Sequence, residues 1–460
     1  MSPESLLRAA VSDLRDRLSG PVLEPAGAGY DEARQVFNAM IDRRPAAIAQ
    51  CENPADVAAA ITWARAQDLE ISVRGGGHSV AGLAVTGGGL MIDLRRMRGV
   101  RVDPQARTAR VAGGATMSHL DRATEPFGLA VTGGRVSTTG VGGFTLGGGS
   151  GWVERKFGLA CDNLLSAELV TADGELITAD SQQHPELFWA LHGGGGNFGV
   201  ATALTFRLHD LPVLTMALLL WPAEAGTEIT RAYRDFMAGA PDEVGGGLVY
   251  LTGPPEEFVP EHLVGQLLCG VVLCYTGPQD AALPVFAPLL ELGDAARVQM
   301  EMPYAEFQCM LDDPPGLRNY WSAEYLGTFP DEAAEAFGQQ ARNMLVPSPS
   351  QQALLPLGGA LDRPDGDYPV PWRHSAWAVH PLGLWEDPAD DTRAKQWSDG
   401  LRDAMSPWAS GAVYLNFIGD EGWSRVVAGY GEAGYARLSD VKAQYDPANV
   451  FHLNHNVLPA

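Results

Sequence analysis

Short apolar runs separated by glycine dominate the first part of the chain. The runs at residues 70–74, 90–94, 108–112, 167–171 and 200–208 are strand-like. Helical patterns are fewer. One covers residues 53–67, where Asn53 can cap the helix and Pro54 takes its first position, and another covers residues 184–191. The residues up to about 210 are therefore predicted to form an α+β unit, with glycine-rich turns that leave room for a ligand.

The pattern changes at about residue 212. Beyond this point glycine becomes rarer, while Trp, Tyr, Phe and Met become more frequent. Longer strand patterns at 215–221 and 265–275 alternate with helical patterns at 228–238 and 330–344. This predicts a second domain built on a large sheet. A last helix is expected at 435–445, followed by a closing segment at 449–459.

Length and charge narrow the function classes. A chain of 460 residues is long for one domain, which favours two folding units. Its 32 basic and 56 acidic residues give a formal charge of -24, so neither nucleic acid nor an anionic membrane is expected as a partner. No stretch approaches the ~20 continuous apolar residues of a membrane helix. Residues 1–20 have an amphipathic helical pattern without the apolar core of a secretory signal.

The five cysteines are scattered along the chain, and no two form a CxxC pair. They predict buried free thiols in a reducing cytoplasm, with neither a disulfide framework nor a metal site. They are Cys51, Cys161, Cys269, Cys274 and Cys309.

Two glycine segments could bind phosphate groups. Residues 194–199 match GxGxxG, but a dinucleotide fingerprint follows a strand and opens a helix, and here that order is inverted. Residues 71–79 are more informative, because an apolar strand ends in Arg74 and three glycines and is followed by His78. Consecutive backbone N–H groups at such a turn can bind pyrophosphate without a lysine. Taken alone, a histidine at this place is more often a structural hydrogen-bonding residue than a cofactor ligand.

Five segments taken together resemble one protein family. They are VRGGGHS (73–79), TGVGGFTLGGGSGWVERKFGLACDNL (139–164), ELFWALHGGGGNFGVATALTF (186–206), VYLNF (413–417) and LSDVKAQYDPANVFHLNHNVLP (438–459). In this order they resemble the vanillyl-alcohol oxidase and p-cresol methylhydroxylase superfamily of flavoproteins, and within it the berberine-bridge-enzyme-like branch. The resemblance spans almost the whole chain.

The resemblance implies an α+β fold of two domains. Residues 1–211, with a core at about 43–211, are expected to form an FAD-binding domain of the p-cresol methylhydroxylase type. Residues 212–410 are expected to form a substrate domain with a large antiparallel sheet, and residues 411–460 to return to the FAD domain. The resemblance also implies that His78 bonds covalently to the 8α-methyl group of the flavin. A covalent flavin is a stronger oxidant, which suits difficult C–H oxidation.

The resemblance also assigns the residues around the FAD. They are Arg74, Gly75, Gly76, Gly77, His78, Ser79, Gly82, Thr132, Gly133, Val136, Thr138, Thr139, Gly140, Gly143, Gly149, Asp162, Val200, Asn454 and Asn456. Many relatives attach the flavin a second time through a cysteine eight residues before the aromatic or histidine residue of a GxGG[HF] segment. Counting back from Phe144 reaches Val136, so a second, cysteinyl bond is excluded there, and Cys161 is expected to be a buried thiol.

Two further departures from the family concern deprotonation of the substrate. Several relatives use a tyrosine base at the fourth position of Y-x-N-Y, which here reads Tyr414-Leu415-Asn416-Phe417, and phenylalanine cannot accept a proton. On a strand, positions 414 and 417 face opposite sides, so Tyr414 is not expected to replace that base directly. Some relatives also place an acidic residue on the strand equivalent to residues 353–360, which is apolar here.

Aromatic and titratable clusters of the middle domain are the candidate substrate pocket, because ligand sites combine aromatic side chains with few polar groups. His374 and Tyr320 are the candidate bases, and Tyr414 and Thr139 complete the catalytic candidates. The expected pocket residues are Trp321, Tyr325, Trp372, Arg373, Trp377, Asn416 and Phe417, and His380 belongs to the same clusters.

Thr139 bears on reactivity toward oxygen. In relatives, the residue before the first glycine of TGVGG controls the access of oxygen to the flavin. Small β-branched residues admit oxygen there and leucine excludes it, so Thr139 favours an oxidase. A bacterial polyketide-pathway oxygenase of the family, which uses a flavin-N5-oxide, is similar around both His78 and Thr139.

The sequence thus favours a flavoprotein oxidase of secondary metabolism. It is expected to take a hydride from a small organic or natural-product substrate, such as an alcohol, an amine or a polyketide-like compound, and to be reoxidised by O2 with formation of H2O2. A flavin-N5-oxide oxygenase is one alternative. The missing tyrosine suggests another, a flavin-binding protein without turnover. The expected partners are a small-molecule substrate and O2, and the expected state is a cytoplasmic monomer or homodimer.

Overall fold

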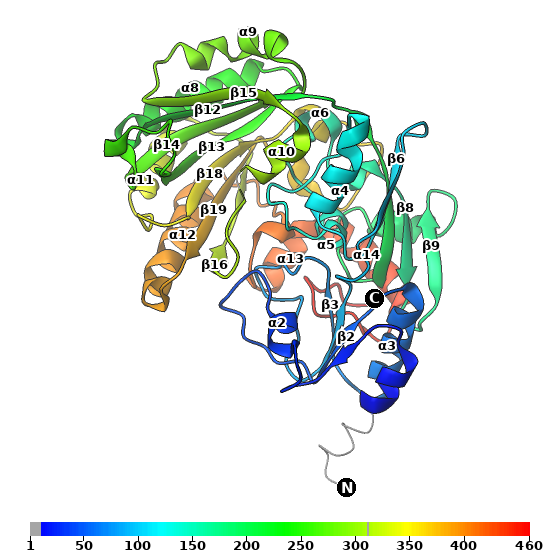
Figure 1. Ribbon diagram of the computed structural model, residues 1–460. Helices are drawn as coiled ribbons and strands as arrows, with labels where there is room; N and C mark the ends of the chain where they lie inside the picture. The colour runs from blue at the N-terminus through cyan, green and yellow to red at the C-terminus, as the bar shows by residue number, and fades with distance from the viewer. Residues whose placement is uncertain (1–10, 311) are drawn as a thin grey trace.

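The chain forms two lobes that meet along one side (Figure 1). The computed structural model describes residues 11–310 and 312–460. Of the N-terminal helix expected at residues 1–20, residues 11–17 are helical, and residues 1–10 lie outside the described residues. Within the two described ranges, no helix is both long and apolar enough to cross a membrane.

The first lobe contains two main sheets. In the four-stranded sheet, of order β1-β2-β4-β3, strands β2, β4 and β3 run parallel. The five-stranded sheet, of order β5-β6-β10-β8-β9, is antiparallel, and β11 pairs with β7. The strands are β1 Val22–Leu23, β2 Ala47–Gln50, β3 Ile71–Arg74, β4 Leu90–Asp93, β5 Val100–Asp103, β6 Thr108–Ala112, β7 Leu129–Ala130, β8 Leu164–Val170, β9 Leu176–Asp180, β10 Val200–Arg207 and β11 His209–Asp210.

Apart from α3, the helices of this lobe are short. They are α2 Tyr30–Arg34, α3 Pro54–Ala66, α4 Met117–Thr124, α5 Val141–Leu146, α6 Glu154–Phe157 and α7 Pro185–Ala190. The Asn53 side chain caps α3, as expected, by accepting a hydrogen bond from the backbone N–H of Asp56 at 3.0 Å. Helix α7 precedes the 193–196 glycines and β10 follows them, so the order is the inverse of a dinucleotide fingerprint.

The second lobe is built on an eight-stranded sheet. Its order is β15-β12-β14-β13-β18-β19-β16, with β17 also paired to β19, and the pairings are antiparallel. Its strands are β12 Leu214–Pro222, β13 Val244–Thr252, β14 Leu267–Tyr275, β15 Ala296–Met302, β16 Arg318–Trp321, β17 Glu324–Leu326, β18 Gln351–Pro356 and β19 Trp377–Trp385. The α+β fold with a large antiparallel sheet, expected from the sequence, is confirmed.

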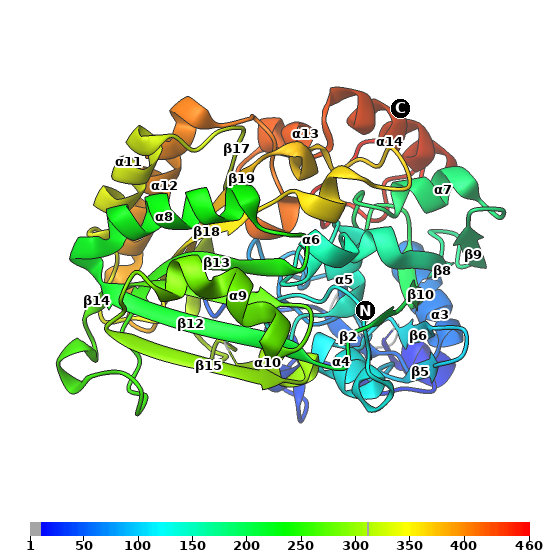
Figure 2. The same ribbon diagram turned by 90° about the horizontal axis from the view of Figure 1, so that it is seen from above.

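Helices cover one face of this sheet (Figure 2). They are α8 Gly226–Gly239, α9 Gln279–Leu290, α11 Asp331–Ala341 and α12 Asp391–Met405. Their apolar side chains share one buried cluster with alternate residues of the strands, including Leu219, Val271 and Val379. The intervening residues of the central strands face the first lobe instead, because successive side chains of a strand point to opposite faces.

The C-terminal part of the chain returns to the first lobe. After α10 Tyr304–Cys309 and the large sheet, the last helices are α13 Trp423–Tyr430 and α14 Glu432–Tyr445. Leu415, Leu438 and Val457 lie in one buried cluster with Phe198 and Leu204 of the first lobe. The C-terminal part therefore completes a core of the first lobe, where α14 contacts α7.

All five cysteines are free thiols, as expected. Four are buried, and Cys309 is half-buried. Burial raises the pKa of the Cys161 thiol, which has no cysteine partner.

A buried ion pair fixes the C-terminal segment. The Lys442 ammonium group donates to the Asp446 carboxylate at 2.6 Å and to the backbone carbonyls of Asn197 and Phe451 at 2.7 and 2.9 Å. Asp446 also accepts hydrogen bonds from the backbone N–H groups of Val450 and Phe451. Neither charged side chain is exposed to solvent. One cation thus connects α14, the glycine loop at 193–199 and the closing segment at 449–459.

We expect Lys442→Met to destabilise the protein by about 3–5 kcal/mol, because the buried Asp446 carboxylate loses its counter-charge. The midpoint of thermal unfolding should fall accordingly. The matched control on the same helix is Arg437→Met, which removes a surface ion pair with Glu186 whose side chains are 43% and 58% exposed and should cost at most about 1 kcal/mol. Equal shifts in the two variants would contradict this account.

Candidate functional site

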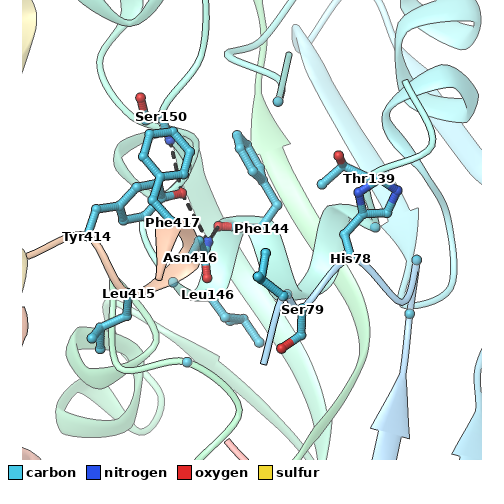
Figure 3. Close-up of a pocket in the computed structure, with 18 of the residues that line it drawn as sticks. His78, Ser79, Thr139, Phe144, Leu146, Ser150, Tyr414, Leu415, Asn416 and Phe417 are labelled. Atoms are coloured by element: carbon cyan, nitrogen blue, oxygen red, sulfur yellow. Dashed lines mark hydrogen bonds between the residues drawn. The ribbon is translucent and has the colours of Figure 1, made fainter. Parts of the chain in front are cut away.

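A cavity of about 390 Å³ lies where the two lobes and the C-terminal segment meet. Three groups of residues line it: the glycine-rich loops of the first lobe, the open face of the large sheet, and the turn at residues 414–417. Figure 3 shows His78 and Thr139 from the loops together with Tyr414, Asn416 and Phe417 from the turn. A site formed by three distant stretches of sequence exists only in the folded chain.

Two glycine loops touch each other at one wall of the cavity. Strand β3 ends at Arg74, and the loop that follows reaches a positive φ of 78° at Gly77, where glycine is favoured. A Cβ atom on Gly76 would lie 2.2 Å from the backbone nitrogen of Gly140, and a Cβ on Gly140 would lie equally close to Gly76. Only glycine allows this approach, which places the residues after Gly77 beside those before Gly140.

The position of His78 follows directly from this contact between the two glycine loops. Its Nε2 lies 2.8 Å from Thr138 Oγ1, and its ring stacks on Phe37 with centroids 4.1 Å apart. Burial, and secondly the nearby Arg74 guanidinium, lowers the pKa of His78 to about 4. The imidazole is therefore neutral at physiological pH and keeps a nitrogen lone pair available for bond formation.

Many of the residues assigned to the cofactor do line the cavity. They are Gly75, Gly76, Gly77, His78, Ser79, Val136, Thr139, Gly140, Gly143, Val200 and Asn454. Thr138 is not part of the lining, but its hydroxyl group forms a hydrogen bond with His78, which is. Gly143 and Gly196 present bare backbone to the cavity, because a Cβ atom on either would meet nothing within 4 Å.

Other residues assigned to the cofactor do not line the cavity, and each has a different partner. Arg74 lies beneath its loop and donates to the carbonyl of Ala33. Gly82 faces Ile41. The Thr132 hydroxyl donates to the Gly158 carbonyl at 2.6 Å.

The remaining residues that were assigned to the cofactor but do not line the cavity are packed behind its wall. The Gly133 N–H donates to the Tyr304 hydroxyl at 3.2 Å, and the Gly149 N–H donates to that of Tyr414 at 3.0 Å. Asp162 forms a buried ion pair with Arg373. Asn456 lies outside the lining. These residues lie outside the lining of the cavity, and their contact with the cofactor stays a prediction.

The turn at residues 414–417 corrects another expectation. Leu415–Phe417 is a 3-10 turn rather than a strand, so the rings of Tyr414 and Phe417 are on the same side, with centroids 4.7 Å apart. Both residues line the cavity. The Tyr414 hydroxyl points away from it, however, and accepts hydrogen bonds from the N–H groups of Gly149 and Ser150 and from Asn416 Nδ2, at 3.0, 3.2 and 3.0 Å (Figure 3). Burial raises the pKa of Tyr414 to about 12, so it remains a neutral phenol.

The open face of the large sheet forms the opposite wall. Strand β18 contributes Gln351, Ala353 and Leu355, and β19 contributes His380 and Leu382. The lining residues of β18 carry no acidic group, in agreement with the apolar pattern of residues 353–360. Trp321 comes from the neighbouring β16, and its indole Nε1 is buried without a hydrogen-bond partner among the described residues.

The two candidate bases lie outside the cavity. Tyr320 precedes Trp321 on β16 and therefore points to the opposite face, where its hydroxyl donates to Asp399 of α12 at 3.0 Å. His374 is exposed on the turn before β19. Strand alternation and chain direction thus place both side chains outside the cavity.

Four of the expected pocket residues pack into the protein core instead. Trp377 lies on the helix-covered face of the sheet, against Tyr233 and Phe329. Tyr325 and Trp372 pack on each other with ring centroids 5.4 Å apart, and Arg373 holds Asp162. Only Trp321, Asn416 and Phe417 of the expected pocket line the cavity.

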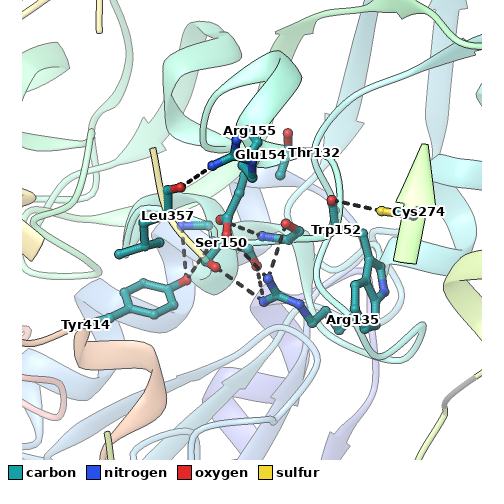
Figure 4. Close-up of polar contacts among 12 residues, drawn as sticks. Thr132, Arg135, Ser150, Trp152, Glu154, Arg155, Cys274, Leu357 and Tyr414 are labelled. Carbon is teal, nitrogen blue, oxygen red and sulfur yellow. Dashed lines mark hydrogen bonds and ion pairs between the residues drawn. The ribbon is translucent and has the colours of Figure 1, made fainter. Parts of the chain in front are cut away.

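A polar cluster behind the cavity was not foreseen (Figure 4). Arg135 lines the cavity, lies 3.4 Å from the Glu154 carboxylate, and stacks over Trp152. Arg155 of the same segment donates to the carbonyl of Val244 in β13, at 2.9 Å, and to that of Leu357, directly after β18. Residues 149–155 thus connect the lobes. The position of Arg135 next to Val136, in a loop assigned to the cofactor, was the signal that could have identified it.

Asp313 is a second unforeseen residue of the cavity. It is half-buried in the segment between α10 and β16. Burial, and secondly the neighbouring Asp312, raises the pKa of Asp313 to about 7. Its sequence context, two adjacent acidic residues, contains no motif that points to a site.

Comparison with known proteins agrees with this geometry. Residues 45–180 match the family model of the FAD binding domain, and residues 413–458 match that of berberine and berberine-like proteins. The chain is 29% identical to the FAD-linked oxidoreductase YgaK of Bacillus subtilis, over 97% of this chain and 98% of that protein. It is 30% identical to (R)-6-hydroxynicotine oxidase of Paenarthrobacter nicotinovorans, over 96% of this chain and 97% of that enzyme.

A solved structure has the same architecture. The crystal structure of 6-hydroxy-D-nicotine oxidase from Arthrobacter nicotinovorans superposes with a TM-score of 0.84 at 28% identity, covering 96% of this chain and 98% of that one. The sequence match and the shared fold extend over nearly the full length of both proteins. The chain therefore belongs to the berberine-bridge-enzyme-like branch of the vanillyl-alcohol oxidase superfamily and is an FAD-linked oxidoreductase.

Proposed function

We propose that the protein is an oxidase of a small organic substrate, with O2 as the electron acceptor and H2O2 as the product. The observation that carries this proposal is the arrangement of His78 and Thr139 on one wall of a cavity whose other wall is the aromatic and apolar face of the large sheet. The similarity to a relative named as an oxidase supports it.

The cavity fits FAD in three respects. Bare backbone at Gly143 and Gly196 lets a flat ligand approach closely. Consecutive N–H groups at residues 75–77, which line the cavity, can bind a pyrophosphate. Asn454 lines the cavity with an Oδ1 atom that is buried and has no hydrogen-bond partner among the described residues. When bound, FAD supplies a two-electron acceptor for a hydride.

His78 is the residue that would carry the flavin covalently, through the 8α-methyl group. Its neutral imidazole and its position after the glycine turn support this role. A second bond through cysteine has no candidate in the cavity, because none of the described cysteines lines it.

The walls of the cavity suit an uncharged organic substrate. Trp321, Phe417 and Leu382 provide apolar surface, whereas Trp321 Nε1 and Gln351 provide polar contacts. Sites of this composition bury the body of a small ligand and orient it through a few hydrogen bonds. Thr139, a small residue of the opposite wall, leaves room for O2 to reach the cofactor.

If His78 is bonded covalently to the flavin, the flavin should stay with the protein after denaturation in acid. Peptide mapping should place its mass on the peptide that contains His78, and His78→Ala should release all flavin into the supernatant. His192→Gln is the control, since His192 is also a buried histidine stacked on an aromatic ring, Tyr368, but lies outside the cavity. Release of flavin from the wild-type protein would exclude the bond.

Thr139 is expected to govern the oxidative half-reaction. Thr139→Leu should leave reduction by substrate nearly unchanged and slow reoxidation by air at least about tenfold, because the larger side chain fills the space through which O2 approaches. Thr139→Val keeps the β-branched shape and should reoxidise at the wild-type rate. Stopped-flow mixing of reduced protein with aerated buffer measures both variants, and an unchanged rate in Thr139→Leu would show that O2 enters elsewhere.

A further inference from the structure

His380 lies beside Phe417, which occupies the position of the tyrosine base of several relatives. Its imidazole stacks on Phe417, the residue at the tyrosine position, with ring centroids 4.2 Å apart and an angle of 11° between the rings. Strand pairing places it opposite Ala353 on β18, in the apolar stretch where some relatives carry an acidic residue. His380 therefore adjoins both positions from which a conventional base is absent.

The hydrogen bonding of His380 leaves one nitrogen facing the cavity. Nδ1 lies 2.8 Å from the backbone carbonyl of Ser322, and a carbonyl can only accept, so Nδ1 carries the proton. Nε2 is then the unprotonated nitrogen. Within residues 11–310 and 312–460, no protein group forms a hydrogen bond with Nε2, although the residue lines the cavity.

The ring is held firmly in this orientation. His380 lies within β19, between the pairings with β18 and β17, and is buried. Trp321 packs edge-on against it with centroids 5.8 Å apart, and Phe417 covers one of its faces. Together with the bond from Nδ1, these contacts leave the imidazole no alternative orientation that keeps Ser322 paired.

The protonation state of His380 suits an acceptor. Burial lowers the pKa of His380 to about 4; the Ser322 carbonyl opposes this shift, and the charged Arg135 adds to it. Ser322, Trp321 and Phe417, which pack against the ring, bring no charge to it. Nε2 is consequently unprotonated throughout the neutral pH range, and its lone pair is available.

The other titratable groups of the site are placed less favourably. The Tyr414 hydroxyl is directed at the backbone of residues 149–150. Tyr320 and His374 do not line the cavity. Asp313 does, and in the described part of the chain its carboxylate has neither a hydrogen bond nor an ion pair to fix its orientation, whereas Asp312 is fixed by the Ser137 N–H at 2.6 Å.

We propose that His380 is the proton acceptor of the reaction and that the substrate is an aromatic alcohol whose hydroxyl group donates to Nε2. This inference rests on the proposed oxidase function. The O–H bond of the alcohol breaks and its proton passes to Nε2, while the C–H bond of the carbinol carbon breaks and its hydride passes to the two-electron acceptor of the enzyme. The alcohol becomes a carbonyl compound, and the imidazolium later returns its proton to solvent.

Anaerobic stopped-flow reduction of the flavin-loaded protein by a panel of aromatic alcohols, beginning with benzyl alcohol, tests the proton transfer. His380→Gln keeps a hydrogen-bond acceptor but cannot take a proton, so the limiting reduction rate should fall by about 10²–10⁴-fold, while the dissociation constant of the alcohol changes less than about threefold. His192→Gln, the control, should reduce at the wild-type rate. The wild-type rate should be level at neutral pH and fall as the pH drops through about 4, since only the unprotonated ring accepts.

Binding of phenol provides a test without turnover, because phenol has a hydroxyl group but no carbinol hydrogen. Its dissociation constant, measured from the change in flavin absorption, should rise about tenfold in His380→Phe, which retains the ring stack on Phe417 but loses the acceptor. Unchanged binding in this variant would overturn the assignment of Nε2 as the acceptor.

The outcomes separate the two proposals. If alcohols reduce the wild type and His380→Gln equally fast, or if Asp313→Asn slows reduction more than His380→Gln, the role of His380 is wrong and the oxidase proposal stands. If no alcohol in the panel reduces the wild type, both the alcohol oxidase activity and the proton transfer that depends on it are refuted.

Discussion

The contact between the backbones of Gly76 and Gly140 is the constraint on which the rest of the site depends. A side chain on either residue would place its Cβ 2.2 Å from a backbone nitrogen, and no rotamer change can relieve a clash between main-chain atoms. The contact fixes two loops side by side although 64 positions separate the two glycines. The hydrogen bond between His78 and Thr138 and the position of Thr139 on the same wall both follow from it. The positions of His78 and Thr139 in the cavity wall are thus set by one steric requirement.

The residues of the opposite cavity wall are determined differently, by the alternation of side chains along each strand. On β16, Trp321 faces the cavity while Tyr320 reaches Asp399 of α12. On β19, His380 faces the cavity while Trp377 packs among the helices. A shift of one position along a strand therefore decides whether a side chain lines the cavity or packs on the opposite face of the sheet.

This contrast explains what could be predicted from the sequence. The glycine loops and His78 form a local motif, and its order along the chain was enough to place it in a family. The large sheet was also predictable, from longer apolar runs. The wall that faces the substrate was not, because the aromatic clusters at 318–325 and 371–380 do not reveal strand register, and register determines which of their members face inward.

The turn at 414–417 is a second case in which the sequence identified the residues but not their conformation. The motif correctly singled out Asn416 and Phe417, which line the cavity. Its conformation was mistaken because a four-residue segment carries too little periodicity to distinguish a strand from a 3-10 turn. The direction of the Tyr414 hydroxyl depends on the N–H groups of Gly149 and Ser150, more than 260 positions away, and no local pattern records such a partner.

The contribution of both chain ends to one lobe has a consequence for biosynthesis. Leu415, Leu438 and Val457 complete the core begun by residues near 200, and Lys442 binds the carbonyl of Asn197. A chain emerging from the ribosome folds its N-terminal parts first, yet here that lobe lacks part of its core until residues 415–457 have been released. Assembly of this lobe therefore waits for residues 415–457, and a chain that ended before Leu453 would lack Leu453, Asn454 and His455 of the cavity lining.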